Sequence, residues 1–234
     1  MQPIQVAEIE KGNIWMLDHV FSEEECQYFL QASDGIGYEE APVTVGKNSF
    51  KMLKDVRNNT RAMTDNPQFA FILYDRLKPY LPVRADMLSR EVVSDKLAQG
   101  YELCGMNERI RFYKYGKGEY FVPHFDGFFQ REPYEKIING EAHVCMERSF
   151  MTVLLYLNNM KSGGATDFLY NNKSIKYSVT PKMGRVLMFA HSNYHQGNVH
   201  TDPNEFKHVM RSDVMYRKLI KKCQIAHKCI KTIL

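Results

Sequence analysis

Two histidines and one aspartate have the types and the spacing to hold a metal ion. His124 and Asp126 are two positions apart, and His195 follows 71 positions after His124 (195 − 124). Residues i and i+2 of a β-strand point to the same side, so one strand can direct His124 and Asp126 at one metal while a distant strand supplies His195. Two imidazoles and one carboxylate that leave coordination positions open are typical of non-haem iron(II) sites that react with dioxygen. The sequence therefore predicts these three residues as metal ligands and catalytic residues.

The bulk composition indicates a folded globular chain. Its 234 residues are 44% hydrophobic and 25% charged, which suits one elaborated domain or at most two small ones. The formal net charge of +4 tolerates an anionic substrate but does not by itself indicate nucleic-acid binding. The five cysteines are an odd number without a CxxC pair, which argues against a disulfide framework and against a zinc knuckle.

The N-terminus and the hydropathy pattern bear on location. Met1–Gln5 is polar and no apolar signal region follows it. The sequence also contains no stretch of eighteen apolar residues. We therefore expect a cytoplasmic or nuclear protein without a membrane span.

The elements that must position the three ligands are mainly short strands. Helices are expected at residues 21–32, with Ser22 as the N-cap, and at residues 67–80, and both are expected to pack on a sheet. From Glu108 onward the pattern changes to apolar runs separated by Gly, Pro and Asn. The expected strands are 109–113, 149–157, 175–179, 185–190 and 207–216. The predicted fold is mostly β, a jelly-roll or cupin-like core with N-terminal supporting α-helices.

Three polar segments surround this predicted core. Residues 35–64 are mixed and polar and are expected to form an exposed hairpin or loop. Residues 129–148 are charged and are expected to form a loop at the mouth of the core, where lids occur. Residues 218–234 are basic, with apolar residues at helical spacing, and predict a C-terminal helix.

Five short motifs occur in order along the second half of the chain: Tyr115–Asp126, Tyr156–Asn158, Gly163–Phe168, Pro181–Arg185 followed by His195–Gly197, and Lys207–Tyr216. Each motif alone is weak, but the order and spacing of all five resemble one known family, the prolyl-4-hydroxylase type of 2-oxoglutarate/iron(II)-dependent dioxygenases. Gly163–Phe168 is similar to the family's GGxTxF. The Gln196-Gly197 pair that follows favours His195 as the third ligand over His191 and His200, which lie nearby.

The resemblance covers roughly residues 107–217 and implies a double-stranded β-helix that binds iron(II) and 2-oxoglutarate. The family activates O2 by decarboxylating 2-oxoglutarate to succinate, and it hydroxylates a C–H bond; ascorbate is a possible further requirement. Residues 107–217 are then the dioxygenase core, and residues 1–106 are a helical and hairpin region that packs on it.

The resemblance also implies which residues bind 2-oxoglutarate. Lys207 matches the cation that binds its distal carboxylate, Tyr156 matches a tyrosine that donates to the same carboxylate, and Tyr115 matches a tyrosine of the pocket. The interval from His195 to Lys207 is longer than is usual in the family. Arg211, four residues later on the same strand face, is therefore an alternative cation, and it can equally pair with Asp213 to hold substrate.

Several functions are compatible with these residues. The first is a hydroxylase of a peptidyl, prolyl-like side chain, with the 129–148 segment closing over an extended peptide or protein substrate. The second is an oxidative demethylase of nucleic-acid bases, since Arg211 and Arg217 are six positions apart, although no aromatic lid for a flipped base is evident. A small-molecule hydroxylase stays open. A non-catalytic cupin-like binding module is disfavoured because such a module is expected to have lost at least one ligand.

Overall fold

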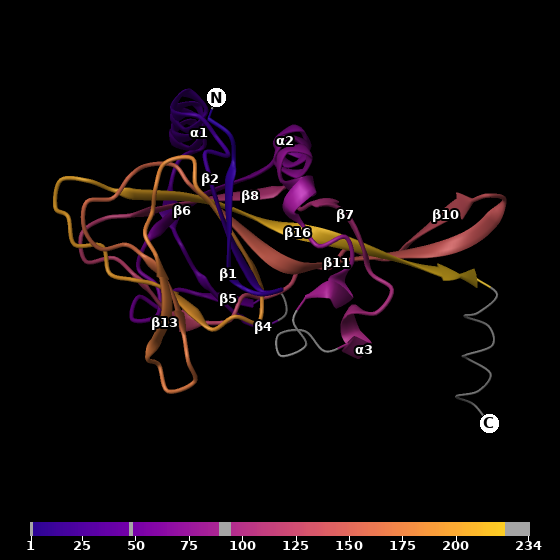
Figure 1. The fold of residues 1–234 in the computed structure, drawn as a ribbon. Coiled ribbons are helices and arrows are strands. Elements are labelled where there is room, and N and C mark those ends of the chain that lie inside the picture. Colours follow the sequence, from indigo (N-terminus) through magenta and orange to yellow (C-terminus); the bar gives the residue numbers. More distant parts are fainter. Residues whose placement is uncertain (1, 47–48, 89–94, 223–234) are drawn as a thin grey trace.

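The computed structural model describes residues 2–46, 49–88 and 95–222 of the chain. In this part, helices flank a large β-sheet whose other side carries a smaller sheet (Figure 1). The helices are α1 (Glu23–Ile36), α2 (Pro67–Leu77) and α3 (Asp95–Ala98), with short 3₁₀ turns η1 (Lys78–Tyr80) and η2 (Ala85–Met87). The strands are β1 (Gln5–Glu10), β2 (Ile14–Asp18), β3 (Glu39–Glu40), β4 (Val43–Gly46), β5 (Ser49–Lys51), β6 (Thr60–Asp65), β7 (Glu102–Met106), β8 (Arg109–Tyr115), β9 (Phe121–His124), β10 (Tyr134–Ile138), β11 (Glu141–Tyr156), β12 (Thr166–Leu169), β13 (Ile175–Val179), β14 (Val186–Ala190), β15 (His195–Gly197) and β16 (Lys207–Lys221).

Two antiparallel sheets form the core of the described residues. The larger has ten strands along the path β1-β2-β14-β11-β16-β8-β6-β3, with β10 added to β11 and β7 added to β16. The smaller has four strands in the order β13-β12-β15-β9. Apart from the consecutive pairs β1–β2 and β12–β13, most neighbouring strands on both paths come from distant parts of the chain, as in a jelly roll. The predicted mostly-β core with supporting N-terminal helices is confirmed.

Alternating side chains of the central strands enter two buried clusters. In β11, Val153 and Leu155 belong to the cluster on the helix side, whereas Tyr156 belongs to the cluster between the two sheets. A strand that is covered on both faces needs apolar residues at nearly every position, which explains the apolar run at residues 149–157.

The two long helices pack on the large sheet as their apolar spacing predicts. In α1, the Ser22 hydroxyl accepts from the Glu25 N–H (3.2 Å), and the Glu25 carboxylate accepts from the Ser22 N–H (2.8 Å), which completes a capping box. Phe29 of α1 and Leu73 of α2 are buried in one cluster with residues of β11 and β14. No helix among the described residues is both long and apolar enough to cross a membrane.

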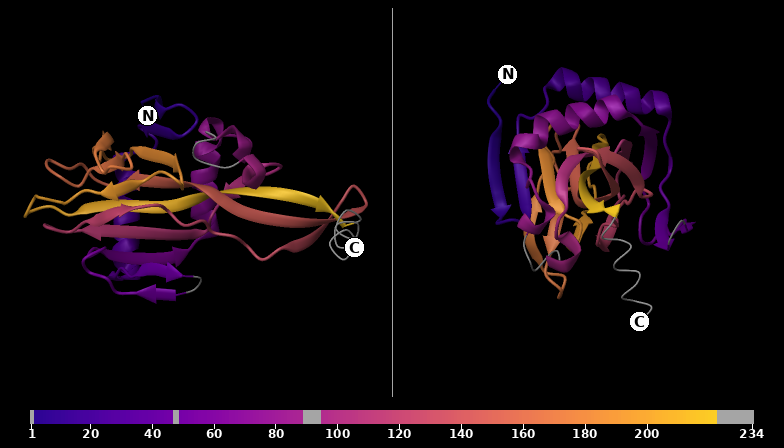
Figure 2. Two further views of the ribbon diagram at one scale, coloured as in Figure 1. Left: turned by 90° about the horizontal axis from the view of Figure 1, so that it is seen from below. Right: turned by 90° about the vertical axis from the view of Figure 1, so that its right-hand side faces the viewer.

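Two segments fold differently from the sequence prediction. Residues 129–148 contain β10 and the first half of β11, which run with the end of β16 out of the core as a ribbon (Figure 2). The helix predicted from residue 218 is wrong at its start, because Lys218–Lys221 continue β16 and pair with β11 up to His143. The hydrogen-bond ladder of a distant strand outweighs the local helical spacing there. Residues 223–234 of the predicted helix lie outside the described residues.

Candidate active site

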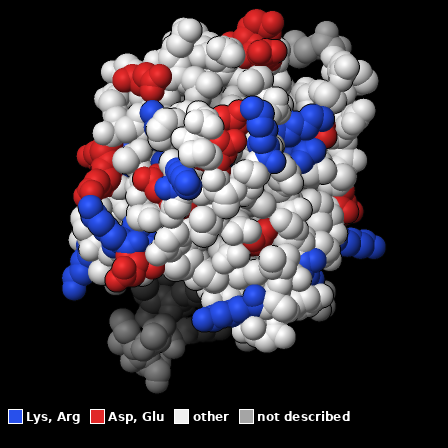
Figure 3. Space-filling view, turned by 90° about the vertical axis from the view of Figure 1, so that its left-hand side faces the viewer, with Lys and Arg blue, Asp and Glu red and all other residues white. Residues whose placement is uncertain are grey.

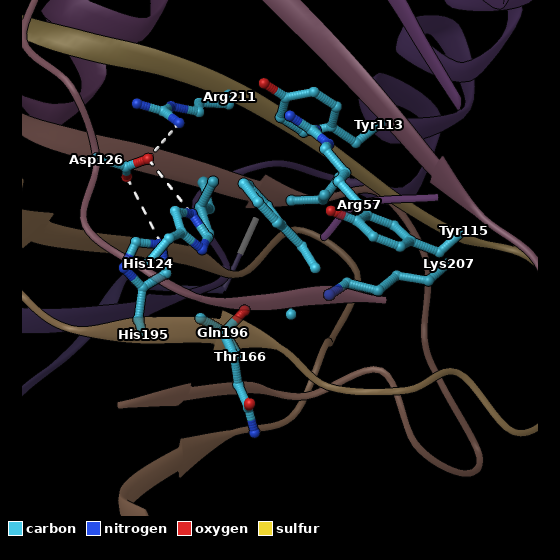
Figure 4. A pocket seen from close by; sticks show the side chains of 14 residues that line it. Arg57, Tyr113, Tyr115, His124, Asp126, Thr166, His195, Gln196, Lys207 and Arg211 are labelled. Atoms are coloured by element: carbon cyan, nitrogen blue, oxygen red, sulfur yellow. Dashed lines mark hydrogen bonds and ion pairs between the residues drawn. The ribbon is translucent and has the colours of Figure 1, made fainter. Parts of the chain in front are cut away.

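His124, Asp126 and His195 converge on one point between the sheets, as predicted (Figure 4). β15 and β9 are neighbours, and their register places His195 directly opposite His124. One ligand atom from each of the three residues lies within 4.8 Å of the others. The Nε2 atoms of His124 and His195 are 3.8 and 3.7 Å from the two carboxylate oxygens of Asp126.

The protonation states of this cluster suit a divalent cation. His124 Nδ1 donates to the carbonyl of Val122 (2.8 Å) and His195 Nδ1 to that of Asn193 (2.9 Å), so each Nε2 carries a free lone pair. Burial lowers the pKa of His124 to about 3 and also lowers that of His195, so both rings are neutral at pH 7. Burial opposes ionisation of Asp126, but the Arg211 guanidinium beside it outweighs this and holds the pKa of the carboxyl below its usual range.

A chain of hydrogen bonds orients Asp126 from behind. Thr152 donates its hydroxyl proton to Asp126 Oδ2 (2.6 Å), and the Thr152 hydroxyl oxygen lies 3.0 Å from His191 Nδ1. Because the Thr152 proton goes to Asp126, His191 Nδ1 donates to the Thr152 oxygen, and His191 Nε2 accepts from the Ser149 hydroxyl (2.8 Å). Burial lowers the pKa of His191 to about 4, so this ring is neutral as well. His191 is thus buried behind Thr152 and is not one of the three ligand candidates, in line with the preference for His195.

Thr152 therefore supplies a testable positioning contact. In Thr152→Val the shape is kept but Asp126 loses a donor, and we expect Mn(II) affinity to fall about tenfold, since partners behind a ligand are worth about 10- to 100-fold in affinity. Isothermal titration with Mn(II) measures this. Thr152→Ser keeps the hydroxyl and serves as the matched control. Equal Mn(II) affinity in the valine variant would show that Asp126 needs no such support.

Arg211 is committed to carboxylates of the protein. Its guanidinium donates to Asp126 Oδ1 (2.5 Å) and to Asp213 Oδ1 (3.2 Å). Asp213 also accepts from Arg111 (3.3 Å) and Asn107 (3.2 Å). The sequence left Arg211 open as the cation for a distal carboxylate, and the structure instead places it as a partner of the metal-ligand candidate Asp126.

Lys207 is the buried pocket cation that has no such partner. Its side chain lines the same pocket, and within the described residues no carboxylate lies within ion-pair distance of its Nζ. Burial lowers the pKa of Lys207 to about 8, against a smaller opposing effect of Asp167. Nζ lies 4.9 Å from the ring centre of Tyr115, which also lines the pocket and sits opposite Lys207 in the β8–β16 register. In Figure 4 the two residues lie across the pocket from Asp126.

The position of Lys207 explains the second glycine of the Gly163-Gly164 pair. Gly164 has φ +65, and a Cβ there would lie 3.2 Å from the Lys207 side chain. Tyr156 is fully buried, and its hydroxyl donates to Thr166 Oγ1 (2.8 Å), behind the pocket wall. Of these two residues, Thr166 lines the pocket and Tyr156 does not. The predicted tyrosine Tyr156 therefore lies behind Thr166 and not at the pocket surface.

Arg57 is a pocket residue that the sequence analysis missed. It lies in the segment expected to be exposed, yet it is only 6% exposed and forms an isolated β-bridge with Phe121 beside His124. Its neighbours are also anchored: Asn59 accepts from Arg57 Nε (2.7 Å), and Asn58 accepts from the Tyr120 N–H (2.8 Å). The only local signal is the Arg-Asn-Asn run itself, which resembles any polar loop.

Comparisons with known proteins agree with this geometry. The family described as the 2OG-Fe(II) oxygenase superfamily matches residues 110–211, the range that contains the three ligand candidates, Lys207 and Arg211. A relative described as probable prolyl 4-hydroxylase 7 of Arabidopsis thaliana is 25% identical over 206 residues, which is 82% of this chain and 55% of the relative. Together the family match and the relative support a 2-oxoglutarate/iron(II) oxygenase of the prolyl-4-hydroxylase type. The chain spans about half the length of that relative.

Solved structures share the fold of this chain at low sequence identity. A viral collagen prolyl hydroxylase of Paramecium Bursaria Chlorella virus-1 is 15% identical with a TM-score of 0.52, covering 87% of this chain and 96% of its own. A prolyl-4-hydroxylase of Pseudomonas putida is 14% identical with a TM-score of 0.51, covering 86% and 91%. A prolyl hydroxylase of Trichoplax adhaerens, solved with a peptide fragment, is 13% identical with a TM-score of 0.52, covering 87% and 83%. These likenesses show the jelly-roll fold.

Proposed function

We propose that this oxygenase hydroxylates a C–H bond of a peptidyl, prolyl-like side chain and couples the reaction to decarboxylation of 2-oxoglutarate. One observation carries the proposal. The candidate ligands His124, Asp126 and His195 share one pocket with Lys207, a buried cation that lacks a carboxylate partner among the described residues. A site for a divalent metal and a site for a dicarboxylate are thereby adjacent.

The three ligand candidates suit iron(II), with coordination positions left for a 2-oxo acid and O2. Iron(II) bound there with 2-oxoglutarate and O2 supplies an oxidant strong enough to remove hydrogen from an aliphatic carbon. The protein orients the ligands and excludes water. Asp126 is fixed by donors from both sides, Arg211 on Oδ1 and Thr152 on Oδ2, so its position does not depend on the metal alone.

The distal carboxylate of 2-oxoglutarate is assigned to Lys207. A buried ammonium group forms a strong charge-assisted hydrogen bond with a carboxylate that reaches it. Tyr115 and Thr166 line the wall beside Lys207 and can add hydroxyl donors. Arg211 is the weaker assignment, because a second carboxylate there would compete with Asp126 and Asp213 for the same guanidinium.

The choice of a peptidyl substrate rests on relatives and on the pocket. The relative and the fold neighbours are named as prolyl hydroxylases, and one neighbour was solved with a peptide. The spacing of Arg211 and Arg217 does not create a paired-arginine site, since Arg217 lies outside the pocket and pairs with Glu147 (2.7 Å). Basic and acidic side chains also alternate on the face shown in Figure 3, unlike a continuous basic track for nucleic acid.

The reaction is tested by succinate formation from 2-oxoglutarate with iron(II) and ascorbate. We expect slow formation by the protein alone and faster formation with prolyl peptides, accompanied by a 16 Da mass gain of the peptide. Oligonucleotides with methylated bases form the comparison set. Absence of succinate under every condition would refute the oxygenase assignment, and stimulation by oligonucleotides alone would refute the peptidyl substrate.

Binding of 2-oxoglutarate should weaken at alkaline pH. The pKa of Lys207 is about 8, so its ammonium form, which binds the carboxylate, is present below pH 8 and is lost above it. We expect the Kd of the Mn(II)-loaded protein for 2-oxoglutarate to be nearly constant from pH 6 to 7.5 and to rise by up to about tenfold per unit above pH 8. Titration calorimetry across this range measures it. Lys207→Arg should remain flat to higher pH, and an alkaline rise of the same size in that variant would assign the effect to another group.

A further inference from the structure

Arg57 has an unused hydrogen-bonding edge inside the pocket. Its side chain is held by Asn59 at Nε and lies between two rings, with Cζ 4.3 Å from the centre of Tyr113 and 4.6 Å from that of Phe121. Nη2 is buried and has no hydrogen-bond partner among the described residues. Leaving a buried charged donor without a partner is costly, so an arginine in this position indicates that a ligand completes it.

The charges of the pocket show which ligand is missing. Its charged lining residues are one carboxylate, Asp126, and three cations, Arg57, Lys207 and Arg211. Arg211 pairs with Asp126 and Asp213, and Lys207 is assigned to the distal carboxylate of 2-oxoglutarate. Arg57 is then the lining cation for which neither the described residues nor the cosubstrate provides an anion.

Arg57 also lies in a different part of the pocket from Lys207. One aromatic ring lies between its guanidinium and the metal-ligand candidate His124, since Phe121 stacks on His124 with ring centres 3.6 Å apart. Lys207 instead lies beside Tyr115, near Gly164. In Figure 4 Arg57 and Lys207 occupy different sides of the Tyr115 ring. An anion on Arg57 would therefore lie in the same pocket as the candidate metal ligands, beside the ring that stacks on His124, and on another side of Tyr115 from Lys207.

We propose that Arg57 binds a carboxylate of the primary substrate, so that the hydroxylated prolyl-like residue carries or directly precedes an acidic group. A planar guanidinium held between rings is pre-organised to grip a carboxylate, and one unpaired cation matches a single negative charge. The inference rests on the proposed function and narrows its substrate class to acidic prolyl compounds, such as a C-terminal proline or a proline followed by Asp or Glu.

The test compares matched acids and amides by binding. Protein loaded with Mn(II) and N-oxalylglycine, an inert analogue of 2-oxoglutarate, is titrated with N-acetylproline against its amide, and with N-acetyl-Pro-Asp-amide against N-acetyl-Pro-Asn-amide. We expect the wild type to bind the acid of at least one pair about tenfold more tightly, the effect of one charged hydrogen bond. Arg57→Gln should abolish the preference, Arg57→Lys should keep part of it, and the exposed-site control Arg84→Gln should keep all of it.

Two results would overturn the inference. One is equal binding, or no binding, of acid and amide in every pair by the wild type. The other is loss of N-oxalylglycine affinity in Arg57→Gln and Arg57→Lys, which would assign Arg57 to the cosubstrate. Because these are binding measurements with Mn(II), they are independent of the succinate assay. A chain that forms no succinate but prefers acids would refute the proposed function and leave the assignment of Arg57 intact.

Discussion

Alanine at position 124, 126 or 195 lowers succinate formation more than about a thousandfold, because each change removes one of three metal ligands. A bound metal stabilises the reacting charges by several kcal/mol, and each 1.4 kcal/mol is about a factor of ten in rate. The measurements are succinate formation and Mn(II) affinity by titration calorimetry, which should fall in parallel for His124→Ala and His195→Ala. His208→Gln, a histidine of β16 outside the pocket lining, is the control and should keep both.

The Asp126 variants should differ from the histidine variants in their unfolding free energy. Asp126→Ala leaves the Arg211 guanidinium buried with one carboxylate fewer, which should cost about 3 kcal/mol or more of unfolding free energy. Asp126→Asn keeps one acceptor oxygen, which can face Arg211, and should be better folded but equally inactive. The histidine variants should unfold close to the wild type. Substantial activity in any folded variant of these three residues would show that the metal centre lies elsewhere.

The sequence predicted the metal cluster because strand periodicity is a local property. His124 ends β9 and Asp126 follows two residues later, so the i, i+2 spacing brings both side chains to one site although Asp126 lies just beyond the strand. His195 was selected by the Gln-Gly pair after it. The capping box of α1 and the apolar strand at 149–157 could also be predicted, because each depends on residues that are close together in the sequence.

The missed features depend on pairing between distant segments. Arg57 is buried because Phe121 and Tyr113, from two other strands, close over a segment that is polar along its own length. Lys218–Lys221 have helical spacing but extend β16 because β11 offers a partner strand. Thr152 looks like one more residue of an apolar strand, and only the three-dimensional approach of Asp126 gives its hydroxyl a function.

The sequence spacing left open whether Lys207 or Arg211 binds the distal carboxylate of 2-oxoglutarate. The variant Lys207→Met distinguishes these two assignments. This variant removes one partner of a buried charge pair, a loss of about 2 to 5 kcal/mol, so we expect the Kd and the KM for 2-oxoglutarate to rise about a hundredfold. Mn(II) affinity should change less than about threefold, since Lys207 contacts no metal-ligand candidate. Arg211→Met should show the reverse, with a large loss of Mn(II) affinity through Asp126.

The unfolding free energy tests the assignment of Lys207 without an activity measurement. The pKa of Lys207 is lowered to about 8 in the folded chain from 10.5, so burying its charge destabilises the ligand-free protein at neutral pH. Between pH 8 and 10.5 the unfolded chain binds more protons at this lysine than the folded chain, so the lysine's contribution should make stability rise with pH there. Lys207→Met should remove that contribution and raise the unfolding free energy at pH 7 by about 1 to 3 kcal/mol. If Lys207→Met is less stable than the wild type and binds 2-oxoglutarate normally, the distal carboxylate of 2-oxoglutarate is bound by Arg211 and not by Lys207.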